Sequence, residues 1–169
     1  MSEQPLRTLF LDAMSRVAAT VTIVTTAGPH GQHGMTVSAM CSVSADTEQP
    51  TLLVCLNQAC RTAPLLLANQ VFAVNVLHTR QSDLAGHFAG RGEGSCAGRF
   101  AHGEWMHGTS GAPLLNDALI AFDCRVLETN LIGSHHVIVG AVQAIRMAQA
   151  GKALVYADRA FVGSTPLAA

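Results

Sequence analysis

The fold is most constrained by a series of short β-type segments that follow one another along the chain, many of them separated only by turns. In residues 17–26, apolar side chains alternate largely with threonines, a pattern typical of a strand with one buried face. The Gly- and Pro-containing residues 28–34 predict a turn, and residues 35–43 return to β character. We therefore expect a β-hairpin over residues 17–43.

The later segments continue this pattern, with few helices between them. After a turn at 45–50, we expect strands at residues 51–57, 71–77, 117–128 and 136–146, and a short ribbon near 154–156 and 160–162. The run at 51–57 is almost continuously apolar, which predicts that both of its faces are covered. Helices are expected over 6–16, 61–69 and 81–89, and a glycine-rich loop over 90–98. Because regular alternation of strands with helices is missing, we predict a mainly β protein, a closed antiparallel barrel with peripheral helices.

Composition narrows the class of protein. The length of 169 residues fits a single domain, 1–169. Charged residues make up 12% and hydrophobic residues 49%, which excludes a disordered chain and suggests that a second subunit covers part of the surface. The net charge is −1 without a basic cluster, so no nucleic-acid partner is expected. No apolar run reaches the ~18 residues of a membrane span, and residues 1–5 do not resemble a signal peptide, so we expect a cytoplasmic location and no membrane partner.

The histidines and cysteines do not predict a metal or catalytic centre. The eight histidines form loose pairs such as His30 and His33, without zinc-site spacing, and solvated loop histidines are the simpler interpretation. The five cysteines include no C-x-x-C pair. Cys41, Cys55 and Cys124 lie in apolar strand-like runs and are expected to act as small buried hydrophobic residues. Because neither a G-x-S-x-G motif nor a carboxylate pair occurs, no catalytic acid, base or nucleophile is predicted.

Two segments carry groups suited to a flat, polar ligand with a phosphate. Residues 34–44 place the hydroxyls of Thr36, Ser38 and Ser42 among small residues, although a solvated strand face explains this composition equally well. Residues 57–62 offer an amide, a guanidinium and a hydroxyl just past a strand end. Since the N-terminus of a helix favours anions, a phosphate near Arg61 and Thr62 is physically reasonable.

The order and spacing of the segments resemble the short-chain flavin reductases of two-component flavin monooxygenases, over about residues 6–162. The single motifs are weak, but their order is specific. It comprises Ala19-x-Val21-x-Ile23-Val24-Thr25-Thr26, Gly34-x-Thr36-x-Ser38-Ala39-x-Cys41-Ser42-Val43-Ser44, Leu53-Val54-Cys55-Leu56-Asn57, Phe72-x-Val74-Asn75-Val76-Leu77, Leu84-Ala85-x-x-Phe88-Ala89, Arg99-Phe100 and Gly133-Ser134-His135.

This resemblance implies an FMN-binding split barrel, an antiparallel Greek-key barrel that forms a homodimer. Family members use NADH or NADPH to reduce FMN or FAD, and the reduced flavin diffuses to a separate monooxygenase component. Hydride passes between the two bound molecules, so no catalytic residue is implied. The absence of an arginine cluster for a 2′-phosphate favours NADH.

The resemblance also implies which residues bind the flavin and the nicotinamide. His135 is expected near the nicotinamide, although Ser134 stands where the family has Asp. Cys60 stands where the family often has Ser. The expected contacts to the flavin ring, the ribityl chain and the phosphate are Thr36, Val37, Ser38, Ala39, Ser42, Val43, Asn57, Cys60, Arg61, Thr62 and Phe88. Two alternatives stay open on the same barrel: a non-catalytic protein that binds or stores flavin, and an oxidase of an organic substrate.

Overall fold

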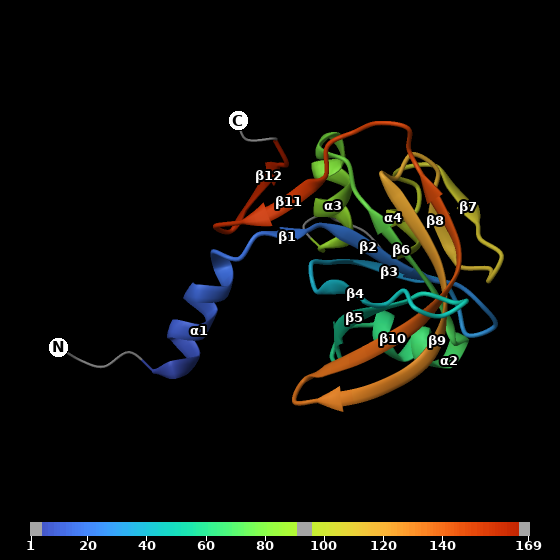
Figure 1. Cartoon of the computed structure of the whole chain (residues 1–169), viewed down its shortest axis with the longest axis horizontal. Helices are drawn as coiled ribbons and strands as arrows, with labels where there is room; N and C mark the ends of the chain where they lie inside the picture. Colours follow the sequence, from blue (N-terminus) through green and yellow to red (C-terminus); the bar gives the residue numbers. More distant parts are fainter. Residues whose placement is uncertain (1–4, 91–95, 166–169) are drawn as a thin grey trace.

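The computed structural model describes residues 5–90 and 96–165, and the fold is built around one seven-stranded antiparallel sheet (Figure 1). Its order is β3-β2-β6-β9-β10-β5-β4. The bounds are β2 Thr22–Thr26, β3 His33–Val37, β4 Met40–Ser44, β5 Thr51–Asn57, β6 Val71–Val76, β9 Ile120–Ile132 and β10 His135–Met147. The predicted mainly β, antiparallel split-barrel fold is therefore confirmed.

Two smaller ribbons complete the β structure. The predicted C-terminal ribbon forms β11 (Leu154–Ala157) and β12 (Ala160–Gly163), and β11 also pairs with β1 (Ala19–Thr20). A second ribbon of β7 (Trp105–His107) and β8 (Pro113–Leu115) was not predicted, because each strand is only three residues long and has no clear alternation.

The two edges of the large sheet are joined by the two residues between β3 and β4. These strands are neighbours in sequence but stand at opposite ends of the strand order. Since only Ser38 and Ala39 separate them, the sheet has to curl until its edges meet, which gives a split barrel. The prediction of one continuous strand over 35–43 is therefore wrong, because the chain changes its pairing partner from β2 to β5 at this point.

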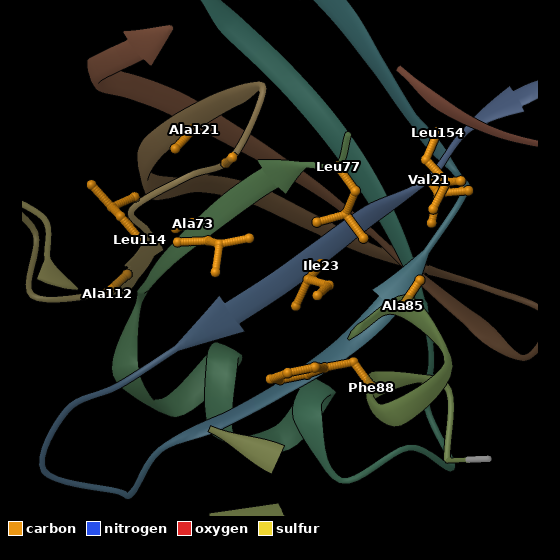
Figure 2. Close-up of a cluster of buried hydrophobic side chains, with 12 residues drawn as sticks. Val21, Ile23, Ala73, Leu77, Ala85, Phe88, Ala112, Leu114, Ala121 and Leu154 are labelled. Carbon is orange, nitrogen blue, oxygen red and sulfur yellow. The ribbon is translucent and has the colours of Figure 1, made fainter. Parts of the chain in front are cut away.

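Two clusters of buried apolar side chains stabilise the barrel. One gathers Val21, Ile23, Leu77 and Phe88 with neighbours from β8 and β11, as Figure 2 shows. The other gathers around Phe72. Strand β2 is buried along its whole length, whereas β5 alternates between buried and half-buried residues. Both burial predictions were thus reversed. Although β2 and β5 are each second from an edge of the sheet, α2, α3 and β8 all pack on β2, and such covering elements cannot be read from the strand's own residues.

The helices lie at the periphery. They are α1 (Leu6–Ser15), α2 (Thr62–Asn69), the 3-10 turn η1 (Thr79–Gln81), α3 (Ser82–Phe88) and α4 (Cys96–Arg99). The predicted loop over 90–98 overlaps α4, and its residues 91–95 lie outside the described residues. Helix α1 projects away from the barrel (Figure 1), and none of its residues is buried. None of the helices in the described ranges is long and apolar enough to cross a bilayer.

Candidate functional site

The break between β3 and β4 presents unpaired backbone at the surface. Among the described residues, β3 pairs only with β2 and β4 only with β5. Within the break, the Ala39 carbonyl accepts the Cys55 N–H at 3.0 Å and the Ser38 carbonyl accepts the Met40 N–H at 3.2 Å. Edge strands of this kind expose N–H and C=O groups. Ser38, Ala39, Ser42 and Val43 are all exposed along this break, so four of the predicted cofactor-binding residues share one accessible segment.

Two neighbours in the same segment have structural roles instead. The Thr36 hydroxyl donates to the Ala85 carbonyl at 2.6 Å and ties β3 to α3. Val37 is buried, and its carbonyl accepts a hydrogen bond from the Thr22 hydroxyl at 2.8 Å. The side chains of these two predicted residues are therefore engaged within the protein, and only backbone groups remain for a ligand at Val37.

The second predicted segment forms a tight turn into α2. The Asn57 side-chain oxygen accepts the Ala59 N–H at 2.9 Å, and the Asn57 carbonyl accepts the Cys60 N–H at 3.0 Å. Cys60 is half-buried in this turn and Arg61 is exposed. The Thr62 side chain is fully buried. The turn thus brings the Arg61 guanidinium to the N-terminus of an eight-residue helix, where an anion is favoured.

A buried histidine lies near two arginines where this turn meets the start of β3. His33 is buried, and its Nδ1 lies 2.8 Å from the Thr62 hydroxyl oxygen. Burial lowers the pKa of His33, and the positive charges of Arg99 and Arg61 lower this pKa further. His33 is thus not a solvated loop histidine, and Arg99, to which the sequence assigned no role, lies near the predicted phosphate site.

The lowered pKa of His33 makes a prediction about stability. The unfolded chain binds a proton near pH 6.5, whereas folded His33 stays neutral to lower pH, so the free energy of unfolding should fall as the pH drops below about 6.5. We expect His33→Gln to show a smaller decrease than the wild type in urea unfolding between pH 7.5 and 5.5. Burial also lowers the pKa of His78, so the free energy of unfolding of both proteins should still fall to some extent over this pH range. An equal decrease in the free energy of unfolding of wild type and His33→Gln would show that His33 does not cause this pH dependence.

His135 lies at the start of β10, directly opposite Asn57 in the ladder between β10 and β5. The preceding Ser134 carbonyl accepts the Gln58 N–H at 2.9 Å, and the Ser134 hydroxyl lies 3.0 Å from His135 Nδ1. The sheet thus brings the exposed His135 beside the turn at 57–60, which residue spacing alone did not indicate. Its role near a nicotinamide stays a prediction.

Phe88 does not lie where a cofactor contact was expected. It is 1% exposed and packs against Phe100 and Trp105, with ring centroids 5.3 and 5.4 Å away. A Cβ on Gly34 would lie 2.9 Å from the Phe88 ring, so β3 also packs closely on this side chain. Phe88 is a core residue, because α3 turns it toward the barrel interior (Figure 2).

Of the three cysteines that were expected to be buried, only Cys124 is buried. Cys124 is buried, and burial raises the pKa of its thiol to about 12, so it is a core residue as predicted. Cys55 is half-buried and Cys41 is exposed, because β4 is an edge strand with an open face. Within the described part of the chain, no cluster of three or more His, Cys, Asp or Glu side chains could hold a metal ion.

A narrow cavity of about 160 Å³ adjoins the break between β3 and β4. Thr36 and Ser38 line it from one side, and Tyr156 and Phe161 of the β11–β12 ribbon line it from the other. The two aromatic rings meet edge to face, with centroids 5.7 Å apart. Aromatic surface therefore lies next to exposed strand backbone, an arrangement that suits a flat ring with polar edges.

Comparisons with known proteins agree with this geometry. Residues 14–165 match the family model described as flavin reductase like domain. The FMN reductase (NADH) RutF of Methylorubrum populi is 44% identical over 152 residues, which span 90% of this chain and 73% of that protein. The solved flavin reductase component of a bacterial two-component tryptophan halogenase is 31% identical, with a TM-score of 0.84 over 93% of this chain and 97% of the other. The styrene monooxygenase flavin reductase of Pseudomonas putida is 26% identical, with a TM-score of 0.81 over 94% of this chain and 99% of the other.

The family match extends over both parts of the candidate site. It includes the β3–β4 break, the turn at 57–62 and the β9–β10 hairpin that carries His135. The resemblance inferred from the order of the sequence motifs is thus confirmed independently by the family match and by the fold. The chain belongs to the flavin reductase like domain family.

Proposed function

We propose that this protein is an NADH-dependent flavin reductase, which transfers a hydride from NADH to FMN and releases the reduced flavin to a separate monooxygenase component. One observation carries the proposal. Strand β3 begins at the buried His33, near the positive charges of Arg61 and Arg99, and ends at the exposed break at Ser38 and Ala39. A phosphate and a flat polar ring joined by a flexible chain match such an arrangement.

The residues fit the flavin in a specific way. The Ser38 and Ala39 carbonyls accept hydrogen bonds within the protein, so their N–H groups and the free edge of β4 are what the backbone offers to the ring. Preorganised N–H groups favour the negative charge of a reduced flavin. Arg61 and Arg99 suit the phosphate. When bound, the flavin supplies the hydride acceptor, and the protein supplies binding, orientation and electrostatics. FMN is proposed over FAD because the relative from Methylorubrum populi is named an FMN reductase that uses NADH.

Steady-state oxidation of NADH tests this function directly. The purified protein is assayed without flavin and with FMN, FAD or riboflavin, using NADH and then NADPH. We expect turnover that saturates with FMN and prefers NADH. If tightly retained flavin accompanies little or no turnover with every combination, the protein is instead a flavin-binding or storage module.

The proposed partner is a flavin-dependent monooxygenase that receives the reduced flavin by diffusion. Two structural relatives support this kind of partner, since one serves a two-component halogenase and the other a styrene monooxygenase. The free thiols of Cys41, Cys55 and Cys60 suit a reducing compartment, which supports the proposed cytoplasmic location.

We also propose that the chain forms a homodimer through its exposed apolar surface. Helix α1 carries Leu6 and Phe10 at 82% and 61% exposure, and the far end of the β9–β10 hairpin exposes Leu131 and Ile132. Exposed apolar surface on this scale is typical of an interface. We expect a dimer in sedimentation velocity and a monomer for Phe10→Asp, whereas an unchanged dimer would place the interface elsewhere.

A further inference from the structure

A large cleft lies between α3 and the β11–β12 ribbon, outside the predicted flavin-binding residues. Its volume is about 630 Å³, within the range of roughly 300–1,000 Å³ typical of small-ligand sites. Figure 1 shows α3 beside β11 and β12, and these elements form the two walls. Phe161 lines this cleft and also the 160 Å³ cavity at Thr36 and Ser38. One aromatic residue therefore separates the cleft from the proposed ring site.

Gly86 lies in the wall of this cleft, in the interior of α3. Apart from its chain neighbours and the backbone of its own helix, no heavy atom lies within 4 Å of the position that a Cβ would take there, and its φ is not in the left-handed region. Neither packing nor backbone conformation therefore requires glycine at this position. Because glycine in a helix interior is less stable than alanine by about 0.5–1 kcal/mol, its presence calls for another explanation. Because Gly86 lies in the wall of the cleft, its location suggests that glycine is present there to keep the cleft open.

Among the described residues that line the cleft, Asp83 is the only one with a carboxylate. It is exposed, and the described residues make no hydrogen bond or ion pair with its carboxylate. The hydroxyl residues Thr79 and Ser82 lie beside it in the lining. A carboxylate in such a place accepts hydrogen bonds from the vicinal hydroxyls of a ribose and repels a 2′-phosphate.

We propose that this cleft binds the adenosine half of NADH, and that Asp83 selects NADH over NADPH. The inference rests on the proposed function and extends it to the second substrate. The nicotinamide end reaches the cavity at Thr36 and Ser38 past Phe161, while the adenosine ribose lies beside Asp83. The open wall at Gly86 leaves room for the nucleoside.

Substitutions at Asp83 test the selectivity. We expect Asp83→Asn to lower the ratio of kcat/KM for NADH to that for NADPH by about tenfold, chiefly through the KM for NADPH, with the KM for FMN unchanged. The matched control is Asp158→Asn, which neutralises an exposed carboxylate in the β11–β12 turn outside the cleft. An unchanged ratio in Asp83→Asn would overturn the inference.

Substitutions at Gly86 test the location. Gly86→Ala should raise Tm, since it favours the helix and meets no neighbour. Gly86→Leu projects a larger side chain into the cleft and should raise the KM for NADH at least tenfold, with the KM for FMN unchanged. ADP-ribose, the probe for the adenosine half, should bind the wild type in calorimetry and bind Gly86→Leu at least tenfold more weakly.

The readouts separate the two proposals. If the wild type oxidises NADH but Gly86→Leu keeps its KM for NADH and its affinity for ADP-ribose, the cleft assignment is wrong and the reductase proposal stands. If the wild type shows no turnover with any flavin, the reductase proposal fails, and the ADP-ribose titrations still decide what the cleft binds. If the variants raise only the KM for FAD, the cleft serves the flavin instead, which also overturns the inference.

Discussion

Replacing Arg61 and Arg99 together with glutamine is expected to weaken FMN binding by about 30- to 100-fold, while riboflavin binding changes by less than about twofold. Arg61 directly precedes α2, and Arg99 lies on α4, which contacts β3. The positive charges of both arginines lower the pKa of the buried His33, which contacts Thr62 at the start of α2. Two charge-assisted contacts to a phosphate are together worth about 2–3 kcal/mol when partly exposed, and about 1.4 kcal/mol corresponds to tenfold in affinity. The Kd values are measured by quenching of flavin fluorescence.

The choice of ligand makes this prediction specific. Riboflavin has the same ring and ribityl chain as FMN but no phosphate, so it reports any general damage to the site. Arg125→Gln removes an exposed arginine from β9, which carries neither Arg61 nor Arg99, and should leave both affinities unchanged. Equal loss of FMN and riboflavin binding in the double variant would show that the arginines support the fold rather than the phosphate. Increasing salt should weaken FMN binding to the wild type more than to the variant.

Replacing Asn75 with alanine is expected to lower the free energy of unfolding by about 3 kcal/mol or more. Asn75 is fully buried on β6. Its amide nitrogen donates to the Ile23 carbonyl at 3.1 Å, and its side-chain oxygen accepts the Leu115 N–H at 2.8 Å. The same amide lies 3.4 Å from the Pro113 carbonyl. A single side chain thus links β2, β6 and β8, and its removal leaves buried polar groups unpaired, at about 1–3 kcal/mol for each group.

Urea unfolding of matched asparagine variants measures this effect. Asn130 is exposed on β9 and donates only to the Glu128 carboxylate within the described residues, at 2.8 Å, so Asn130→Ala should change stability by less than about 0.5 kcal/mol. If Asn75→Ala is too unstable to isolate, its loss from the soluble fraction beside normal yields of Asn130→Ala supports the same conclusion. A decrease below about 1 kcal/mol for Asn75→Ala would show that water replaces the lost hydrogen bonds.

Local patterns were sufficient for much of this protein. The apolar run at 51–57 predicted β5, and the segment 17–26 does form β structure, although it divides into β1 and β2 at Val21. Strand character follows directly from the local side-chain pattern. The helix predicted over 61–69 corresponds to α2 (Thr62–Asn69), because a short helix is encoded within a few residues. The order of the motifs identified the family, which the comparisons confirmed. These features depend only on neighbours along the chain.

Other features depend on which elements meet when the sheet closes. Sequence predicted that Phe88 contacts a cofactor and that His33 is solvated, but α3 packs Phe88 into the barrel and α2 covers His33. No local pattern reports that Arg61 and Arg99, far apart in sequence, both act on His33. The sequence by itself therefore determined most of the strands, the helix at 61–69 and the family. The tertiary structure decided which faces are buried and which charges converge, because both follow from the closure of one sheet through two residues between β3 and β4.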